Sequence, residues 1–233
     1  MRLSLLFTFA LTVSLHAEDS PALTATLKNL PSNETVVRLF NGKDLSGWDG
    51  ATGYWSVEDG TIKAANETPV PSSTYLFTNE GYRNFRLLLE VKQTMSPRHS
   101  TMHSAVAALG ERITEKDGNV HGFRGPLLMF CHDWGIWDAN RRNRIEPSNH
   151  GGTLQVAAEK KGDWNLIEIV AIGDRIQFAA NGTKVFDFTD KPGMLIESPI
   201  GLQLHANSKP QEYRFRGLLL TKNPEERLIT VPQ

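Results

Sequence analysis

The segment 164-WNLIEIVAIGDRIQFAANGTKVFDF-188 decides the fold class, because it predicts three short strands joined by two tight turns. The strands are rich in branched and aromatic residues, and the turns fall at Gly173-Asp174 and Asn181-Gly182. Such dipeptides favour the backbone angles that two-residue hairpin turns require. The segment therefore predicts a meander of antiparallel strands, which is a building unit of all-β domains.

Strand-like segments joined by turn residues also occur outside this meander. Asp59-Gly60 predicts another tight hairpin. Residues 85–92 alternate apolar with charged side chains, which indicates a strand with one solvent-facing side, and Leu88 interrupts the alternation, which indicates partial cover there. No window has a helical period over more than two turns. Strands at intervals of about 8 to 12 residues predict a β-sandwich or barrel.

The first 35 residues are expected to precede the folded domain. Arg2 and the apolar residues 3–15 have the layout of a secretory signal peptide, with cleavage expected after Ala17. No cysteine stands directly after the apolar stretch, so we expect a periplasmic or secreted protein without a lipid anchor. Residues 18–35 are polar and predict a tether. Residues 36–233 then form one β-sandwich domain, which is a routine size for this class.

Charge and hydropathy argue against two classes of partner. The formal net charge is −1, and the only basic cluster is Arg141, Arg142 and Arg144, so nucleic acid is not an expected partner. No second apolar segment is long enough to span a bilayer. Cys131 is the only cysteine, so the hydrophobic core must stabilise the domain without an internal disulfide.

Residues 132–138, with the sequence HDWGIWD, hold the densest collection of functional side chains. Two tryptophans offer flat apolar faces for a sugar ring, and nearby polar groups can bond its hydroxyls. The alternative is a solvated loop whose arginines and aspartates pair with each other, with Arg142 and Glu146 as a surface pair. The candidates for acid–base chemistry are His132 and Asp133, and those for sugar contacts are Trp134, Trp137, Asp138, Arg142 and Glu146.

Two further histidines belong to predicted strands. Gln203 and His205 alternate with leucines, so they share one strand face, as a concave binding sheet requires. The alternatives are a wet convex face or a buried histidine bonded to a carbonyl. His103 shares a face with Ala105 and Ala107, and these small neighbours leave room for a ligand or for an adjacent strand.

Several motifs in this order resemble a known family. They are 40-FNGKDLSGW-48, 54-YWSVEDGTI-62, 164-WN-165, 201-GLQLH-205 and 213-YRFRGL-218. Each fragment alone is a weak signal, but the order and spacing are similar to those of the 3-keto-disaccharide hydrolase domain family. The resemblance extends from about residue 36 to about residue 222.

The resemblance implies a concanavalin-like jelly roll, which is a β-sandwich of two antiparallel sheets, acting on sugars oxidised at C3. A ketone at C3 acidifies the C2 proton, and loss of that proton expels the aglycone from C1, with water adding afterwards where the net reaction is hydrolysis. Such a site needs a base, an electrophile for the enolate oxygen and an acid. On this hypothesis His205 acts with His103, His132 or Asp133, while Arg142 and Gln203 hold sugar oxygens.

One departure from the family affects this hypothesis. Family members often carry a Glu-x-Gln-x-x-Asp strand where this chain has 127-LLMFCHD-133, so apolar residues replace two polar ones. This leaves open a different specificity, a relocated site or a lectin-like domain without chemistry, because jelly rolls host both enzymes and lectins. A third alternative is an interaction protein. A divalent metal ion is a possible cofactor, with His99 and His103 or His132 and Asp133 as ligands.

Overall fold

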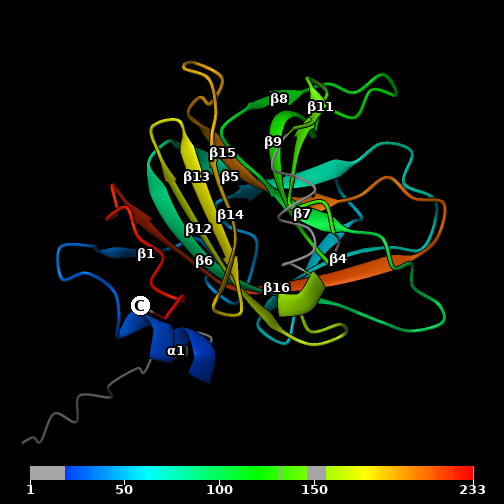
Figure 1. The fold of residues 1–233 in the computed structure, drawn as a ribbon. Coiled ribbons are helices and arrows are strands. Elements are labelled where there is room, and N and C mark those ends of the chain that lie inside the picture. The colour runs from blue at the N-terminus through cyan, green and yellow to red at the C-terminus, as the bar shows by residue number, and fades with distance from the viewer. Residues whose placement is uncertain (1–18, 132, 146–155, 233) are drawn as a thin grey trace, which may run out of the picture.

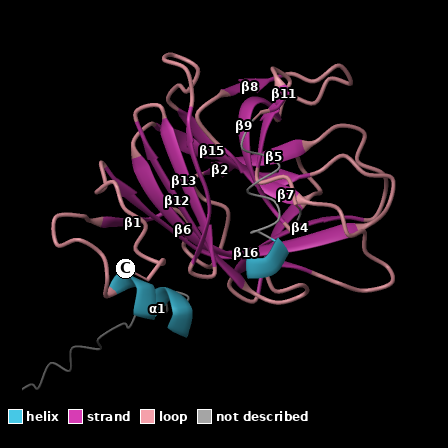
Figure 2. Ribbon diagram, in the orientation of Figure 1, coloured by secondary structure: helices cyan, strands magenta, loops and turns pink. Residues whose placement is uncertain are grey.

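The computed structural model describes residues 19–131, 133–145 and 156–232, which fold into a sandwich of two packed antiparallel sheets (Figure 1). Within these residues each sheet has eight strands, and strands are the predominant secondary structure (Figure 2). The all-β jelly-roll class that the sequence predicts is therefore confirmed. In the described part of the chain, no helix has the length and hydropathy needed to cross a membrane.

The first sheet, sheet A, has the strand order β14-β13-β12-β6-β16-β4-β3, with β1 also paired to β16. The β12–β13–β14 meander at one edge of this sheet follows the predicted hairpins, with positive φ angles of 47° at Asn181 and 82° at Gly182 in the second turn. The strands of sheet A are β1 (Val36–Arg38), β3 (Trp55–Glu58), β4 (Thr61–Asn66), β6 (Phe85–Gln93), β12 (Asn165–Ile172), β13 (Arg175–Ala180), β14 (Thr183–Thr189) and β16 (Gln211–Lys222).

The second sheet, sheet B, has the order β11-β10-β9-β7-β15-β5-β2, with β8 also paired to β9. Strands distant in sequence are neighbours in it, since β15 lies between β7 and β5. Its strands are β2 (Trp48–Asp49), β5 (Thr74–Tyr82), β7 (Ser104–Ala107), β8 (Glu111–Ile113), β9 (Gly122–Phe130), β10 (Ile136–Ala139), β11 (Asn143–Arg144) and β15 (Ser198–Leu204).

The core lies between the two sheets and follows the strand alternation. Leu87 and Leu89 of β6 face Leu202 and Leu204 of β15 across one continuous apolar cluster, and all four are fully buried. Burying such a side chain stabilises the fold by about 1.5–3 kcal/mol. Because the even-numbered residues of β15 point into this core, its odd-numbered residues point to the outer face of sheet B.

The outer face of sheet A is covered by chain segments that flank the sandwich. The helix α1 (Pro21–Leu27) begins after Ser20, whose side chain accepts a hydrogen bond from the Leu23 backbone. Leu23 is fully buried and packs against Leu88 and Ile229. The predicted cover over Leu88 is confirmed. The expectation of a polar tether is wrong for these residues, because the segment docks on the sheet beside the C-terminal end (Figure 1).

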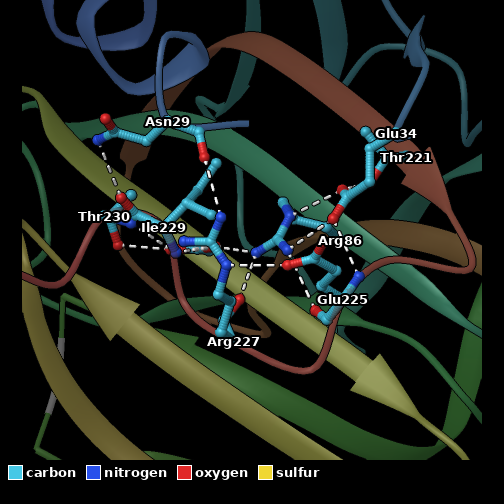
Figure 3. A network of polar contacts seen from close by, with 9 residues as sticks. Asn29, Glu34, Arg86, Thr221, Glu225, Arg227, Ile229 and Thr230 are labelled. Carbon is cyan, nitrogen blue, oxygen red and sulfur yellow. Dashed lines mark hydrogen bonds and ion pairs between the residues drawn. The ribbon is translucent and has the colours of Figure 1, made fainter. Parts of the chain in front are cut away.

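A buried ionic network holds the same flanks (Figure 3). Arg86, on the face of β6 expected to be wet, is 1% exposed and binds Glu34 through Nε and Nη2, at 3.0 and 2.9 Å. Its Nη1 binds Glu168, which also accepts hydrogen bonds from the Ile229 and Thr230 backbones at 2.9 and 2.8 Å. The expectation of a solvent-facing Arg86 is wrong, because two carboxylates and the chain ends enclose it.

Candidate functional site

A cleft of about 390 Å³ hollows the outer face of sheet B. It is lined by side chains of β5, β9, β10, β11 and β15 and by residues of the loops beside the strands of this sheet. Alternation places them there: Gln203 lies between two core leucines, and His205 follows on the same side. His103, one residue before β7, enters from the neighbouring strand. The structure thus brings together three predicted site residues from two segments distant in sequence.

Two histidines are in contact within the cleft. The imidazole rings of His103 and His205 have centroids 4.2 Å apart and planes inclined at 66°. His103 is 3% exposed, whereas His205 is half-buried. Neutral imidazole is both a hydrogen-bond donor and an acceptor, and it exchanges protons near neutral pH. Two such rings in contact have the chemistry that an acid–base pair requires.

A pair of stacked tryptophans forms one side of the cleft. Trp134 and Trp137 have ring centroids 4.8 Å apart and planes inclined at 25°, and Trp134 also lies 5.3 Å from the ring of His103. Trp134 is 39% exposed, which is unusual for so large an apolar side chain. A flat, accessible indole beside two imidazoles can carry the apolar face of a sugar ring.

On another side of the cleft, a tyrosine and a glutamine lie in register on adjacent strands. Gln203 of β15 is paired with Tyr75 of β5, and its Nε2 donates a hydrogen bond to the Tyr75 Oη at 3.1 Å. Both side chains are almost fully buried. Burial raises the pKa of Tyr75, so its phenol remains protonated across the physiological pH range.

The rest of the lining divides into an apolar floor and a polar rim. Leu127 and Met129 of β9 line the cleft with apolar side chains. On the rim, Asn140 donates a hydrogen bond to Glu115 at 3.2 Å. The lining residues that the sequence analysis did not single out as site candidates are Ser72, Ser73, Tyr75, Glu115, Leu127, Met129, Ala139, Asn140 and Asn143.

Asp138 and Arg142 do not line the cleft. Asp138 follows Trp137 on β10 and therefore points the other way, where it is fully buried and accepts a hydrogen bond from Arg141 Nε at 2.8 Å. Arg142 binds Asp138 and makes two hydrogen bonds of 2.8 and 2.6 Å to Asp190. The Asp190 hydrogen bonds outweigh burial and raise the pKa of Arg142. This arrangement matches the alternative in which arginines and aspartates pair with each other.

The remaining predicted residues lie outside the cleft or outside the described chain. Asp133 lines a second cavity of about 410 Å³, together with Cys131 and Glu159. Burial raises the pKa of the Cys131 thiol well above its ordinary value. His132 and Glu146 lie outside the described residues, so their roles stay predictions.

The described residues contain no group of three or more His, Cys, Asp and Glu side chains placed to hold a metal ion. His99, one of the suggested ligands, bonds Ser96 Oγ through Nδ1 at 2.7 Å and does not line the cleft with His103. The other suggested pair includes His132, which lies outside the described residues.

The fold and the cleft together define a class, the concanavalin-like jelly rolls, whose members include carbohydrate-recognition domains. The model of the 3-keto-alpha-glucoside-1,2-lyase-like domain family matches residues 35–221. The chain therefore belongs to this family, which confirms the resemblance drawn from the sequence motifs. It is accordingly a carbohydrate-active domain of the glycosyl-hydrolase-like kind.

Known proteins with similar sequences or folds agree with this assignment. A 3-keto-disaccharide hydrolase of Bacteroides thetaiotaomicron is 22% identical over 172 residues, which cover 65% of this chain and 58% of that protein. The chain thus spans little more than half of that relative.

Among solved structures, a proposed glycosyl hydrolase from Parabacteroides distasonis superimposes with a TM-score of 0.57 at 17% identity, covering 80% of this chain and 93% of the other. The carbohydrate recognition domain of Emp47p gives 0.51 at 11% identity, covering 83% and 96%. At these identities the structural likeness defines the fold alone.

Proposed function

We propose that this protein cleaves 3-keto-glycosides by base-assisted elimination, with the His103–His205 pair as its acid–base centre. The observation that carries the proposal is the 4.2 Å contact between the two imidazoles, inside the cleft and beside the stacked tryptophans. Family membership supports the substrate class, because the family is described by its 3-keto-glucoside lyase activity.

The reaction follows from the groups in the cleft. One imidazole removes the C2 proton, and the electrons of the C2–H bond move into the C3 carbonyl to form an enolate. When the enolate collapses, a C1=C2 double bond forms and the C1–O bond to the aglycone breaks. The aglycone oxygen takes a proton from the imidazolium or its partner, so the histidine pair returns to its starting state. Later addition of water to the unsaturated ketone gives net hydrolysis.

The walls of the cleft support a defined orientation of the sugar. The indole of Trp134 would carry one face of the ring, which holds C1 and C2 near the imidazoles. The floor formed by Leu127 and Met129 is buried and apolar, so it keeps bulk water from the enolate.

The test compares 4-nitrophenyl 3-keto-α-glucoside with the unoxidised 4-nitrophenyl α-glucoside, using the purified protein. We expect nitrophenol release from the keto compound only, and loss of that release in His205→Ala. His121→Ala is the matched control, because this histidine pairs with Asp49 and does not line the cleft. Parallel samples with chelator and with added divalent ions report on any metal requirement.

A lectin-like function is the second candidate, supported by the carbohydrate recognition domain with a similar fold. A lectin needs aromatic faces and hydrogen bonds, but it does not need two imidazoles in contact. Binding of the keto-glucoside without release of nitrophenol, at every metal setting, would overturn the enzymatic proposal and favour the lectin.

We also propose that the protein is exported, on the strength of the apolar N-terminal stretch alone. Expression in a bacterial host followed by osmotic-shock fractionation tests this. We expect the protein in the periplasmic fraction or the medium, with Edman sequencing beginning at Glu18. Full-length protein retained in the cytoplasm, with residues 1–17 attached, would contradict the proposal.

A further inference from the structure

Tyr75 and Gln203 form a polar pair in the cleft that the acid–base chemistry of the histidines does not use. We propose that this pair recognises the ketone: the Tyr75 hydroxyl donates a hydrogen bond to the C3 oxygen, and Gln203 Oε1 accepts one from an adjacent sugar hydroxyl. Tyr75 then becomes the electrophile that holds the enolate. This inference rests on the proposed function and adds a catalytic residue to it.

The hydrogen bonds that Tyr75 and Gln203 make, and the one that Gln203 lacks, support a ligand bound between them. Gln203 Nε2 donates to Tyr75 Oη at 3.1 Å, so the phenol uses a lone pair there and retains its own hydrogen for another acceptor. Gln203 Oε1 is buried and has no hydrogen-bond partner among the described residues, although the side chain is only 1% exposed. Buried polar atoms in native proteins are nearly always bonded, so an unfilled acceptor beside a cleft indicates a ligand atom.

An oxidised sugar carries the complementary groups. The C3 ketone is a pure acceptor, and the hydroxyls at C2 and C4 on either side of it are donors. Tyr75 presents a donor and Gln203 an acceptor from directly paired positions on neighbouring strands. The pair therefore matches the ketone and one flanking hydroxyl simultaneously, from adjacent strands of the same sheet.

The position of the pair relative to the base fits a single sugar ring. Gln203 and His205 are two residues apart on one strand face, which corresponds to about 7 Å along the strand. The C2 hydrogen and the C3 oxygen are on adjacent carbons, so one ring can present the hydrogen to an imidazole and the oxygen to the phenol. The imidazole and the phenol can therefore both reach the same ring from their positions in the sheet.

The protonation state of the Tyr75 phenol suits hydrogen-bond donation to the C3 oxygen. Burial raises the pKa of Tyr75, so the hydroxyl is neutral and donates rather than repelling the developing negative charge. As the C2–H electrons move into the carbonyl, the C3 oxygen gains charge and its hydrogen bond from Tyr75 strengthens. A donor aimed at that oxygen lowers the barrier more than it improves ground-state binding.

The experiment isolates enolate formation from aglycone release. The probe is 3-keto-1,5-anhydroglucitol, which has no leaving group at C1, and proton NMR in D₂O follows exchange of its C2 hydrogen. We expect Tyr75→Phe to slow this exchange about 100- to 1,000-fold and kcat on the nitrophenyl substrate by a similar factor, with KM within about threefold. Tyr82→Phe is the matched control: it lies on the same strand, its ring is in the core, and its exchange rate should equal that of the wild type.

The outcomes separate this inference from the proposed function. Wild-type exchange and release with an unchanged rate in Tyr75→Phe would overturn the role of Tyr75 and leave the elimination proposal standing. No exchange and no release by the wild type would overturn both.

Gln203→Met provides the second variant. We expect it to weaken binding of the keto probe about tenfold by calorimetry. Unchanged affinity would remove the glutamine from the recognition pair. Circular dichroism and thermal melting confirm that each variant is folded.

Discussion

His103 and His205 are in ring-to-ring contact, at 4.2 Å between centroids, because β7 and β15 are neighbours in sheet B. One ring is nearly inaccessible and the other is half-buried at the cleft. In the proposed mechanism the two rings therefore work as one acid–base unit, not as two independent residues.

The first prediction follows from this coupling. His103→Ala and His205→Ala should each lower kcat on the nitrophenyl keto-glucoside by about 100- to 10,000-fold, the usual contribution of a positioned acid or base. The kcat of the double variant should lie within a few-fold of the kcat of the more impaired single variant. The reason is that the effects of groups acting as a unit are not additive. Steady-state release of nitrophenol measures all three. Fully additive losses would indicate independent roles.

The second prediction concerns the stacked tryptophans. Trp134→Ala removes the exposed indole and should weaken binding of 3-keto-1,5-anhydroglucitol about 2- to 10-fold, equivalent to about 0.5–1.5 kcal/mol. Isothermal titration calorimetry measures the change. Trp164→Phe is the control, because that indole lies under Arg216 at 4.0 Å and does not line the cleft. Equal affinity in Trp134→Ala would exclude this indole as a sugar platform.

Local pattern predicted much of the fold but not its outer cover. The turn at Asn181-Gly182 and the alternation along its flanking strands are encoded within a few residues, so the β12–β14 meander is visible in the sequence. Leu23 is different, because its anchoring role depends on Leu88 and Ile229, which are far away in the chain. The same holds for Arg86, whose partners Glu34 and Glu168 come from distant segments.

For the site, too, the sequence predicted features that depend on local pattern and missed those that depend on contacts between distant segments. A period of two places Gln203 and His205 on one face, and that is a local property. Tyr75 was missed because its partner across the β5–β15 pairing lies far along the chain. The local pattern did not predict the strand Ile136–Ala139, which places Trp137 in the cleft and Asp138 on the opposite side.

The third prediction distinguishes binding from stability at Arg142. Arg142→Lys loses the two-pronged contact with Asp190 and should lower the free energy of unfolding by about 1.5–3 kcal/mol, while KM for the keto substrate stays within about twofold. Urea unfolding and steady-state kinetics measure the two effects. Arg98→Lys, in an exposed pair with Glu67, should change neither. A tenfold rise in KM without loss of stability would restore the sugar-binding role of Arg142.

The fourth prediction concerns the buried network that attaches the flanks to sheet A. Arg86→Met leaves two buried carboxylates without their cation and should destabilise the protein by about 3–5 kcal/mol. Glu34→Gln keeps the Arg86–Glu168 pair and should cost about 1.5–3 kcal/mol, the value of charge-assisted hydrogen bonds. Urea unfolding at neutral pH gives both numbers. A larger destabilisation by Glu34→Gln than by Arg86→Met would contradict a network organised around Arg86.

The pH dependence of stability provides the last prediction. Burial alone would raise the pKa of Glu34, but hydrogen bonds from Arg86, Thr221 and the Glu225 backbone outweigh it and hold the pKa below the ordinary 4.5. The folded state therefore binds fewer protons than the unfolded state, so this stabilisation is complete above the unfolded pKa and is lost as pH falls through the folded one. Melting temperatures between pH 7 and pH 3 should fall less steeply in Glu34→Gln than in the wild type. Identical slopes would mean that Glu34 titrates alike in both states and that the network does not depress its pKa.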